Sequence, residues 1–378
     1  MKRKSFFTSI IILVFVALLT GCLNKEQPPS SSSPEGNSES SNQTFNWRMS
    51  STYVQGSIQF ERDVRFVELV NSLSNGRLNI SLHQVGELAD GASLLDTVSN
   101  GTIEMGGDWP GSWRGRNTAF NLLGTTPVGF TAWDYLMWIY AADGHSIYNE
   151  IYGAENLVYF PYNAPGTESG IRSNKPINSV EDLQGMNIRF VGTIQEKILQ
   201  EFGGNPANVA PNELYEALQR GVLDAIEFSS PAGDKAMNFD EVTSYVAVPS
   251  WHQTASVTGV MINQDAWETL PEDIKLIIEV AAKTTMLETT TNEMFKDALV
   301  TNEMLEQGDI TVTEYPNEDL EKIHELAKKF AEELADENPD FAKVLNSQKK
   351  YMEDYSTYRE MQGEWGFGTN SGIFSDIN

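Results

Sequence analysis

Four polar side chains between residues 165 and 231 are of the types that bind a small anion. Glu168, Arg172, Arg189 and Glu227 stand at the ends of apolar runs, where α/β proteins place their ligand sites. An arginine at a strand end can hold a carboxylate through two parallel hydrogen bonds, which lysine cannot do. A lone arginine more often makes a structural ion pair, and glutamates are more often solvated. Residue types alone therefore leave both interpretations open.

The sequence offers no recognisable catalytic constellation. It contains no G-x-S-x-G elbow, no Walker loop and no H-E-x-x-H motif. The histidines lack metal-ligand spacing, and we interpret each as a surface or satisfied polar residue: His83, His145, His252 and His324. These features favour a binding protein. An exported hydrolase or lyase that uses Glu168 and Glu227 as an acid–base pair is the alternative.

The chain is strongly acidic. Its 378 residues carry 53 acidic and 26 basic side chains, which gives a formal net charge of −27. Such a field repels nucleic-acid phosphates and anionic membrane surfaces, so we expect no nucleic acid as a partner. An anionic ligand would need a local cationic pocket. The length suffices for two lobes, each with its own core.

The N-terminus has the features of a lipoprotein signal peptide. Basic residues at positions 2–4 precede an apolar run from 6 to 19 that is short for a membrane span. The run leads into Leu19-Thr20-Gly21-Cys22, which matches a bacterial lipobox. We predict a signal peptide over 1–21 and lipidation of Cys22. The exported protein would be anchored to the outer face of the cell membrane, or be periplasmic in a Gram-negative cell.

Cys22 is the only cysteine of the chain, so none is left for a disulfide, a zinc site or a nucleophile. The segment 22–43 is rich in Ser, Pro, Glu and Asn and almost free of apolar residues. Such a composition cannot bury enough surface to order itself. We therefore predict that this segment is a disordered tether.

The folded part opens with a β-α-β pattern. We expect a strand at 45–49, a helix with apolar residues at helical spacing at 58–73, and an alternating strand at 78–82. This order predicts an α/β fold with a largely parallel sheet.

Two later segments repeat one spacing. Leu94-x6-Gly101-x-Ile103-Glu104 and Leu214-x6-Gly221-x-Leu223-Asp224 each predict a short helix, a glycine that ends it, and a strand. The repeat favours two similar lobes. We predict lobe 1 at 44–165 with part of 255–310 returning to it, lobe 2 at 166–254, and long connecting and C-terminal helices at 265–350.

Three segments resemble motifs of the DctP-type extracytoplasmic solute receptors of tripartite ATP-independent periplasmic (TRAP) transporters. They are Asn187-Ile188-Arg189, the stretch from Gln219 to Phe228, and Pro249-Ser250-Trp251-His252-Gln253. Within that family the chain looks most like the receptors for 2-oxo and 2-hydroxy monocarboxylates. The resemblance implies a two-lobed, periplasmic-binding-protein-like α/β fold, with a ligand cleft between the lobes and long C-terminal helices.

The resemblance also implies how a ligand is bound. Arg189 would clamp the carboxylate of a small organic acid such as lactate or pyruvate. Glu227, the backbone carbonyl of Phe228, Gln253 and Glu168 would hold a metal ion that bridges to the ligand. An all-oxygen set of this kind suits a hard cation, Ca²⁺ or Na⁺, and no organic cofactor is implied.

Aromatic side chains would wall the apolar part of the ligand: Trp109, Trp113 and Phe228. The chain departs from the monocarboxylate receptors at three positions. They often have glutamine where Glu168 aligns, glutamate where Gln253 stands and tryptophan in place of Phe228. The first two differences would move one charge across the site while the number of carboxylates stays the same.

The implied partners are the small and large membrane subunits of a TRAP transporter. Some family members pair as homodimers through a C-terminal helix, and the helical region predicted at 317–345 is compatible with that. A receptor of the same fold could instead bind a C4-dicarboxylate or a sugar acid without metal. Arg172 would then be the second cationic residue that faces the ligand.

Overall fold

The computed structural model describes residues 43–362. Within this range, no helix is both long enough and apolar enough to cross a membrane. The predicted signal peptide, Cys22 and all but the last residue of the predicted tether lie outside the described residues.

The first sheet has five strands in the order β2-β1-β3-β10-β4. Its strands are β1 (Phe45–Ser51), β2 (Leu78–His83), β3 (Met105–Asp108), β4 (Leu157–Asn163) and β10 (Thr258–Asn263). Helix α1 (Ile58–Leu73) connects β1 to its parallel neighbour β2. It begins after Ser57, whose side chain accepts a hydrogen bond from the backbone N–H of Phe60. The predicted β-α-β opening is therefore confirmed.

The second sheet has six strands in the order β11-β9-β5-β8-β6-β7. Its strands are β5 (Ile171–Ser173), β6 (Asn187–Arg189), β7 (Asn205–Ala207), β8 (Ala225–Ile226), β9 (Tyr245–Val248) and β11 (Thr311–Glu314). Strands β6 and β8 are parallel neighbours, with Arg189 opposite Ile226. This pairing brings the ends of two strands that carry predicted site residues side by side.

The prediction of a largely parallel sheet is confirmed, because only one strand in each sheet runs against the others. Strand β10 is antiparallel to both β3 and β4, and β5 is antiparallel to both β8 and β9. Both strands follow directly from a strand of the other sheet, β5 from β4 and β10 from β9. Two neighbouring strands can be parallel only if a crossover connection carries the chain back to the end of the sheet where the first strand began. Neither β5 nor β10 is reached through such a connection within its own sheet.

The repeated helix–glycine–strand units are confirmed, one in each sheet. Helix α2 (Leu94–Ser99) is followed by Gly101 with φ 75° and then by β3, and α7 (Leu214–Gln219) is followed by Gly221 with φ 67° and then by β8. Both glycines adopt the left-handed conformation that ends many helices. How the predicted lobes 44–165 and 166–254 move as units stays a prediction.

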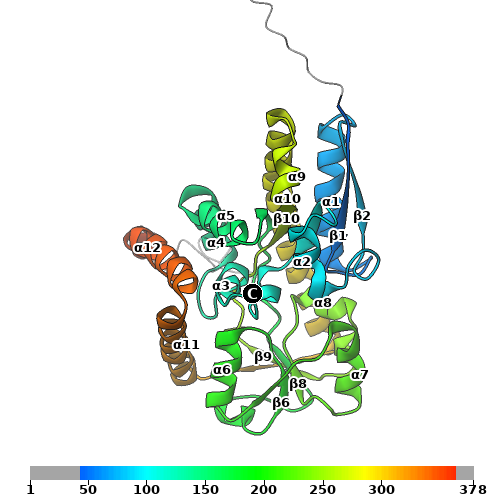
Figure 1. Cartoon of the computed structure of the whole chain (residues 1–378). Coiled ribbons are helices and arrows are strands. Elements are labelled where there is room, and N and C mark those ends of the chain that lie inside the picture. The colour runs from blue at the N-terminus through cyan, green and yellow to red at the C-terminus, as the bar shows by residue number, and fades with distance from the viewer. Residues whose placement is uncertain (1–42, 363–378) are drawn as a thin grey trace, which may run out of the picture. The chain divides into compact units, whose positions relative to one another are not determined.

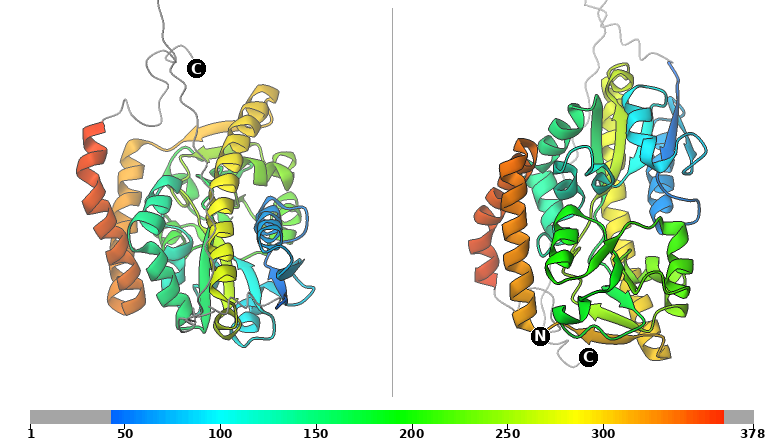
Figure 2. Two further views of the ribbon diagram at one scale, coloured as in Figure 1. Left: turned by 90° about the horizontal axis from the view of Figure 1, so that it is seen from above. Right: turned by 60° about the horizontal axis from the view of Figure 1, so that its bottom comes forward.

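The remaining helices have the following bounds: η1 (Gly91–Ser93), η2 (Pro110–Trp113), α3 (Ala119–Gly124), α4 (Ala132–Ala141), α5 (Gly144–Gly153), η3 (Val180–Leu183), α6 (Thr193–Glu201), η4 (Pro211–Glu213), α8 (Pro231–Ala236), η5 (Phe239–Glu241), α9 (Gln264–Glu268), α10 (Glu272–Gln307), α11 (Asn317–Glu337) and α12 (Pro339–Gln362). Helix α10 packs against strand β4 of the first sheet and against α1, which follows β1 of that sheet. It also packs against α8, which follows β8 of the second sheet (Figure 1). Helices α11 and α12 lie side by side, α11 against α6 and α12 against α3 and α5 (Figure 2).

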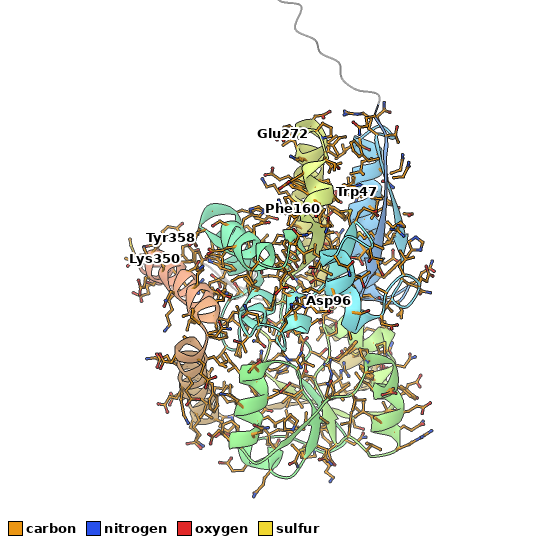
Figure 3. The ribbon with its side chains drawn as sticks, viewed as in Figure 1. Trp47, Asp96, Phe160, Glu272, Lys350 and Tyr358 are labelled. Carbon is orange, nitrogen blue, oxygen red and sulfur yellow. The ribbon has the colours of Figure 1, made fainter. Side chains whose placement is uncertain are left out.

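One core cluster fills the space between the first sheet, α1 and α10. It contains Trp47 of β1 and Phe160 of β4, both of which are labelled in Figure 3. A larger cluster reaches from α3–α5 through the turn at 249–253 to α6, α11 and α12. The two sheets are therefore joined by packed side chains as well as by the crossing strands.

Candidate functional site

Arg189 and Glu227 form the centre of the candidate site. Arg189 ends β6, and the backbone N–H of Glu227 donates to its carbonyl oxygen at 3.1 Å. The Nη1 of Arg189 donates to the Glu227 backbone oxygen at 2.7 Å and to its Oε1 at 3.0 Å. The same Oε1 accepts from the backbone N–H of Val191 at 2.6 Å. The parallel pairing of β6 and β8 thus positions both charged side chains.

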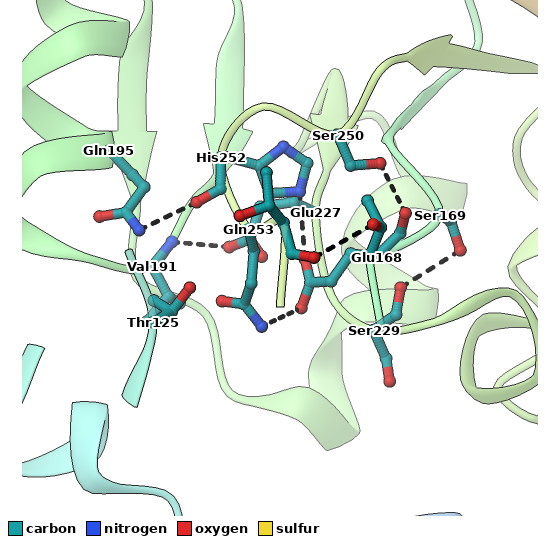
Figure 4. A network of polar contacts seen from close by, with 12 residues as sticks. Thr125, Glu168, Ser169, Val191, Gln195, Glu227, Ser229, Ser250, His252 and Gln253 are labelled. Atoms are coloured by element: carbon teal, nitrogen blue, oxygen red, sulfur yellow. Dashed lines mark hydrogen bonds and ion pairs between the residues drawn. The ribbon is translucent and has the colours of Figure 1, made fainter. Parts of the chain in front are cut away.

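Glu168 is held by the turn that follows β9. The amide Nε2 of Gln253 donates to Glu168 Oε1 at 2.7 Å, and His252 Nε2 lies 3.1 Å from Oε2 (Figure 4). The hydroxyl of Ser250 donates to the Glu168 backbone oxygen at 2.5 Å. Glu168 lies in the segment between β4 and β5, so two of the three connections between the sheets contribute to one site.

The carboxylates and the imidazole form one buried cluster. One ligand-type atom from each of Glu168, Glu227 and His252 lies within 4.8 Å of the others. Burial, together with the negative charge of the nearby Asp234, raises the pKa of Glu168 to about 8. Burial also raises the pKa of Glu227 to about 7, although the Arg189 charge opposes this rise. Burial removes water from both carboxyl groups and so disfavours their ionised forms. The single guanidinium of Arg189 offsets only part of this effect.

His252 is the residue that sequence reasoning missed. It was interpreted as a satisfied polar residue, yet it is 1 % exposed and touches Glu168. Burial lowers its pKa to about 4, so the ring is neutral near pH 7. Its Nδ1 has no partner among the described residues. The ring therefore makes its one described side-chain hydrogen bond through Nε2, to Glu168. Its place beside Gln253 in the resemblance motif was the available signal.

The donor set fits a hard cation. Two carboxylates and the amide group of Gln253 converge, and oxygen donors of this kind are the ligands of Ca²⁺ and Na⁺. His252 Nε2 contacts Glu168, and a histidine in this position orients a ligand carboxylate. With its pKa raised to about 8, Glu168 is largely protonated near neutral pH, and a bound cation would displace that proton and pair with the carboxylate.

The three aromatic residues predicted at the site make different contacts. Phe228 lies beside Arg189, with the guanidinium carbon 5.5 Å from its ring centre. Trp109 donates its indole N–H to the backbone oxygen of Gly124 at 3.2 Å, and Trp113 is buried with its indole N–H 2.5 Å from Asp108 Oδ2. Contact of any of the three with a ligand stays a prediction.

Arg172 lies in a buried ion pair. Its Nε donates to Asp234 Oδ2 at 2.7 Å, and its side chain is 1 % exposed. Another of its nitrogens contacts the sulfur of Met304 on α10. This arginine is paired with a carboxylate of α8, whereas Arg189 lies among the site carboxylates. Its role in ligand binding stays a prediction.

An α/β fold with a buried arginine–carboxylate cluster at strand ends is typical of a protein that binds a small ligand. Residues 49–338 match the family of bacterial extracellular solute-binding proteins, family 7 (DctP), and the chain belongs to this family. Its members are the solute receptors of TRAP transporters and act outside the cytoplasm.

Several relatives resemble the chain over most of its length. The monocarboxylate 2-oxoacid-binding periplasmic protein of Nostoc sp. is 26 % identical over 354 residues, which is 93 % of this chain and 94 % of the relative. The sialic acid-binding periplasmic protein SiaP of Vibrio cholerae is 26 % identical over 60 % of this chain and 70 % of its own length.

Two solved structures of TRAP solute-binding proteins share the fold. The protein from Colwellia psychrerythraea, solved with bound calcium and pyruvate, has a TM-score of 0.80 and 26 % identity, covering 84 % of this chain and 97 % of its own. The protein from Bordetella bronchiseptica, a dimer with copurified calcium and picolinate, has a TM-score of 0.79 and 27 % identity, covering 84 % and 95 %.

Proposed function

We propose that this receptor captures a 2-oxo or 2-hydroxy monocarboxylate, such as pyruvate or lactate, together with a hard cation. The observation that carries the proposal is the buried cluster in which Arg189 lies 3.0 Å from Glu227 and Glu168 contacts Gln253 and His252. Similar proteins with bound calcium and pyruvate or picolinate support it.

Each residue has a distinct part in this proposal. Arg189 binds the carboxylate of the organic acid, because its guanidinium presents a planar fork of donors. Glu168, Glu227, Gln253 and the backbone carbonyl of Phe228 hold the cation, which supplies the positive charge that draws the second oxygen of the ligand. Trp109, Trp113 and Phe228 form the apolar wall. No bond of the ligand is made or broken.

The charges at the site favour a divalent cation. Two ionised glutamates and one arginine sum to −1, and a bound monocarboxylate brings the total to −2. A calcium ion makes the complex neutral, whereas a sodium ion leaves one buried negative charge. Because an uncompensated buried charge is expensive, we propose Ca²⁺ as the preferred cation and Na⁺ as a weaker substitute.

The binding of a C4-dicarboxylate or a sugar acid is the second candidate, because relatives with such ligands also match the chain. It requires a second cationic group at the ligand. The ion pair between Arg172 and Asp234 leaves that arginine already neutralised, which favours the monocarboxylate.

We further propose that the exported protein is anchored through Cys22 and delivers its ligand to the small and large membrane subunits. It would pair as a homodimer, as the Bordetella bronchiseptica protein does. Helix α10 carries seven exposed large apolar side chains: Leu276, Val280, Leu287, Met294, Phe295, Leu299 and Leu305. A second copy is the partner that we assign to this helix face, because the face is apolar and the similar Bordetella bronchiseptica protein is a dimer.

Thermal unfolding of residues 43–378 against a panel of acids tests the proposed function. Pyruvate, lactate, succinate, malate and sialic acid would each be added with Ca²⁺, with Na⁺ alone and with chelator. An acid at a hundred times its dissociation constant adds about 2.7 kcal/mol of stability. We expect pyruvate or lactate to stabilise the protein and chelator to abolish the effect. Stabilisation by succinate or sialic acid that survives chelator would support the second candidate.

A further inference from the structure

The first turn of α6 connects the candidate site to the first sheet. Helix α6 starts at Thr193, four residues after Arg189 and two after Val191, whose N–H holds Glu227. The residue at its N-cap position is Gly192, with φ 122° and no side chain to cap the helix. We call residues 189–191, which connect β6 to α6, the arm. The arm leads into the N-terminus of α6, where no side chain of the N-cap residue accepts a hydrogen bond from the helix.

Asn121 supplies the missing cap from another helix. Its Oδ1 accepts a hydrogen bond from the backbone N–H of Thr193 at 2.9 Å, and its side chain is fully buried. Asn121 lies on α3, which packs on η2, and η2 directly follows the central strand β3 of the first sheet. Thr193 follows β6 of the second sheet. One hydrogen bond thus joins elements that extend from different sheets.

A second contact joins the same two segments. Arg114, the residue after η2, lies 3.3 Å from Glu196 in the first turn of α6. On its other side this turn is bound to the site, because Gln195 donates to the backbone oxygen of His252 at 3.0 Å. A side chain at position 192 would meet Gln195 Oε1 at 2.1 Å, so Gly192 is required for this arrangement. The first turn of α6 therefore contacts His252 of the site and also Asn121 and Arg114, which follow β3 of the first sheet.

We propose that Asn121 is a positioning residue that couples ligand binding to closure of the two lobes. When the lobes close, its Oδ1 caps α6 and fixes the arm that carries Arg189 and the N–H donor to Glu227. This inference rests on the proposed function. A contact made only in the closed state adds its free energy to ligand affinity and not to the stability of the open, ligand-free protein. Arg114 has the same role with a smaller effect, since its ion pair with Glu196 is partly exposed.

Two matched substitutions separate this role from a structural one. Asn121→Leu keeps the volume and removes the acceptor, whereas Asn121→Asp keeps an acceptor oxygen in either protonation state. The Nδ2 of Asn121 has no partner among the described residues, so the aspartate loses no hydrogen bond. Aspartate is also a good residue for capping a helix N-terminus. Arg114→Gln is the third variant.

The measurements are the affinity for pyruvate in saturating calcium, the melting temperature without ligand, and the radius of gyration by solution scattering with and without ligand. We expect Asn121→Leu to weaken pyruvate binding about tenfold, the usual worth of one N-cap. Its ligand-free melting temperature should stay unchanged, and Asn121→Asp should restore the affinity. Arg114→Gln should weaken binding less than threefold, as exposed ion pairs do.

Two results would overturn the inference. If Asn121→Leu lowers the ligand-free melting temperature and leaves pyruvate affinity unchanged, the cap is a permanent structural contact. If the wild-type radius of gyration is the same with and without bound pyruvate, no closure exists for Asn121 to couple. Wild-type protein that binds neither calcium nor pyruvate would instead refute the proposed function itself.

Discussion

The guanidinium of Arg189 donates to the backbone oxygen of Glu227 at 2.7 Å and to its side-chain Oε1 at 3.0 Å. This double contact fixes the arginine at the end of β6 without using all of its five donors. The donors that remain are available to a bound carboxylate. Since Glu168 lies in the same cluster, the site combines one fixed cation with one carboxylate in excess.

Replacement of the two arginines distinguishes the ligand-binding one from the structural one. Arg189→Lys should reduce pyruvate affinity at least a hundredfold, because an ammonium cannot form the bidentate contact. Arg172→Lys is the matched control. It should lower the melting temperature, because its partner Asp234 is buried, and leave pyruvate affinity within about threefold. Isothermal titration calorimetry measures the pyruvate affinity of each variant, and thermal unfolding measures its melting temperature. If Arg172→Lys loses pyruvate affinity and Arg189→Lys keeps it, Arg172 is the arginine that binds the ligand.

Exchange of the charges at positions 168 and 253 tests the cation site. Glu168→Gln removes one of the two carboxylates of the cluster, so calcium affinity should fall by about a hundredfold or more while sodium binds with little change. The double variant Glu168→Gln/Gln253→Glu restores the number of carboxylates and should recover most of the calcium affinity. Calcium titration of each variant measures this. A Glu168→Gln protein with wild-type calcium affinity would exclude Glu168 from the cation site.

The two glutamates predict that calcium-free protein loses stability as the pH rises. Burial raises the pKa of Glu227 to about 7 and that of Glu168 to about 8, both above the usual glutamate value. The folded state therefore binds more protons than the unfolded state, and this stabilisation is lost as the pH rises through these values. His252, with its pKa lowered to about 4, has the opposite sign and acts only below about pH 6.5.

Chemical denaturation between pH 6.5 and pH 8.5 measures this effect. In chelator, the free energy of unfolding should fall by up to about 1.4 kcal/mol per pH unit for each glutamate that ionises. Buried Asp108, with a pKa of about 7, adds a loss of the same sign that calcium does not affect. The difference between calcium and chelator should therefore grow with pH. A difference that is constant over this range would show that the glutamates do not hold calcium.

Much of the fold could be predicted from local patterns. The helix at 58–73, the strands flanking it and the two helix–glycine–strand units follow from apolar periodicity and left-handed glycines, which act over a few residues. The antiparallel crossing strands could not be predicted, because their direction depends on which sheet the chain has just left. That information is not contained in the short strand at 171–173.

The site shows the same division. The resemblance to the solute receptors indicated an acid-binding site with Arg189, Glu168 and Glu227, and the structure brings the three side chains together. Arg172 has the same residue type, but its partner Asp234 lies 62 positions further along the chain. His252 looked ordinary because its contact with Glu168 spans 84 positions. Partners this distant in sequence are set by the tertiary fold alone.

The apolar face of α10 predicts a homodimer. Leu287 and Phe295 are 59 % and 69 % exposed, and charges placed there should disrupt contact with a second copy. Wild-type protein should therefore have twice the mass of one chain by light scattering at micromolar concentration, and Leu287→Glu/Phe295→Glu should be monomeric. Tyr358 on α12 is also exposed but lies outside this face, so the control variant Tyr358→Glu should remain dimeric. A monomeric wild type, or a dimeric double variant, would contradict this assignment.

The lipobox predicts that the full-length protein is bound to membranes. Wild-type protein expressed in a bacterium should partition into the detergent phase, and Cys22→Ser should move it to the aqueous phase. Ligand affinity of the Cys22→Ser protein should be unchanged, because Cys22 precedes the folded part. Wild-type protein in the aqueous phase would show that the anchor is absent.

Calorimetric titration of pyruvate into residues 43–378 tests the central claim most directly. The titration would be done in sodium-free buffer, first with 1 mM calcium chloride and then with excess chelator. Calcium and Arg189 together neutralise the site, so we predict a saturable, exothermic binding curve with one site per chain in calcium. No measurable heat is expected in chelator. Equal pyruvate affinity under both conditions would contradict a receptor that binds its acid through a cation.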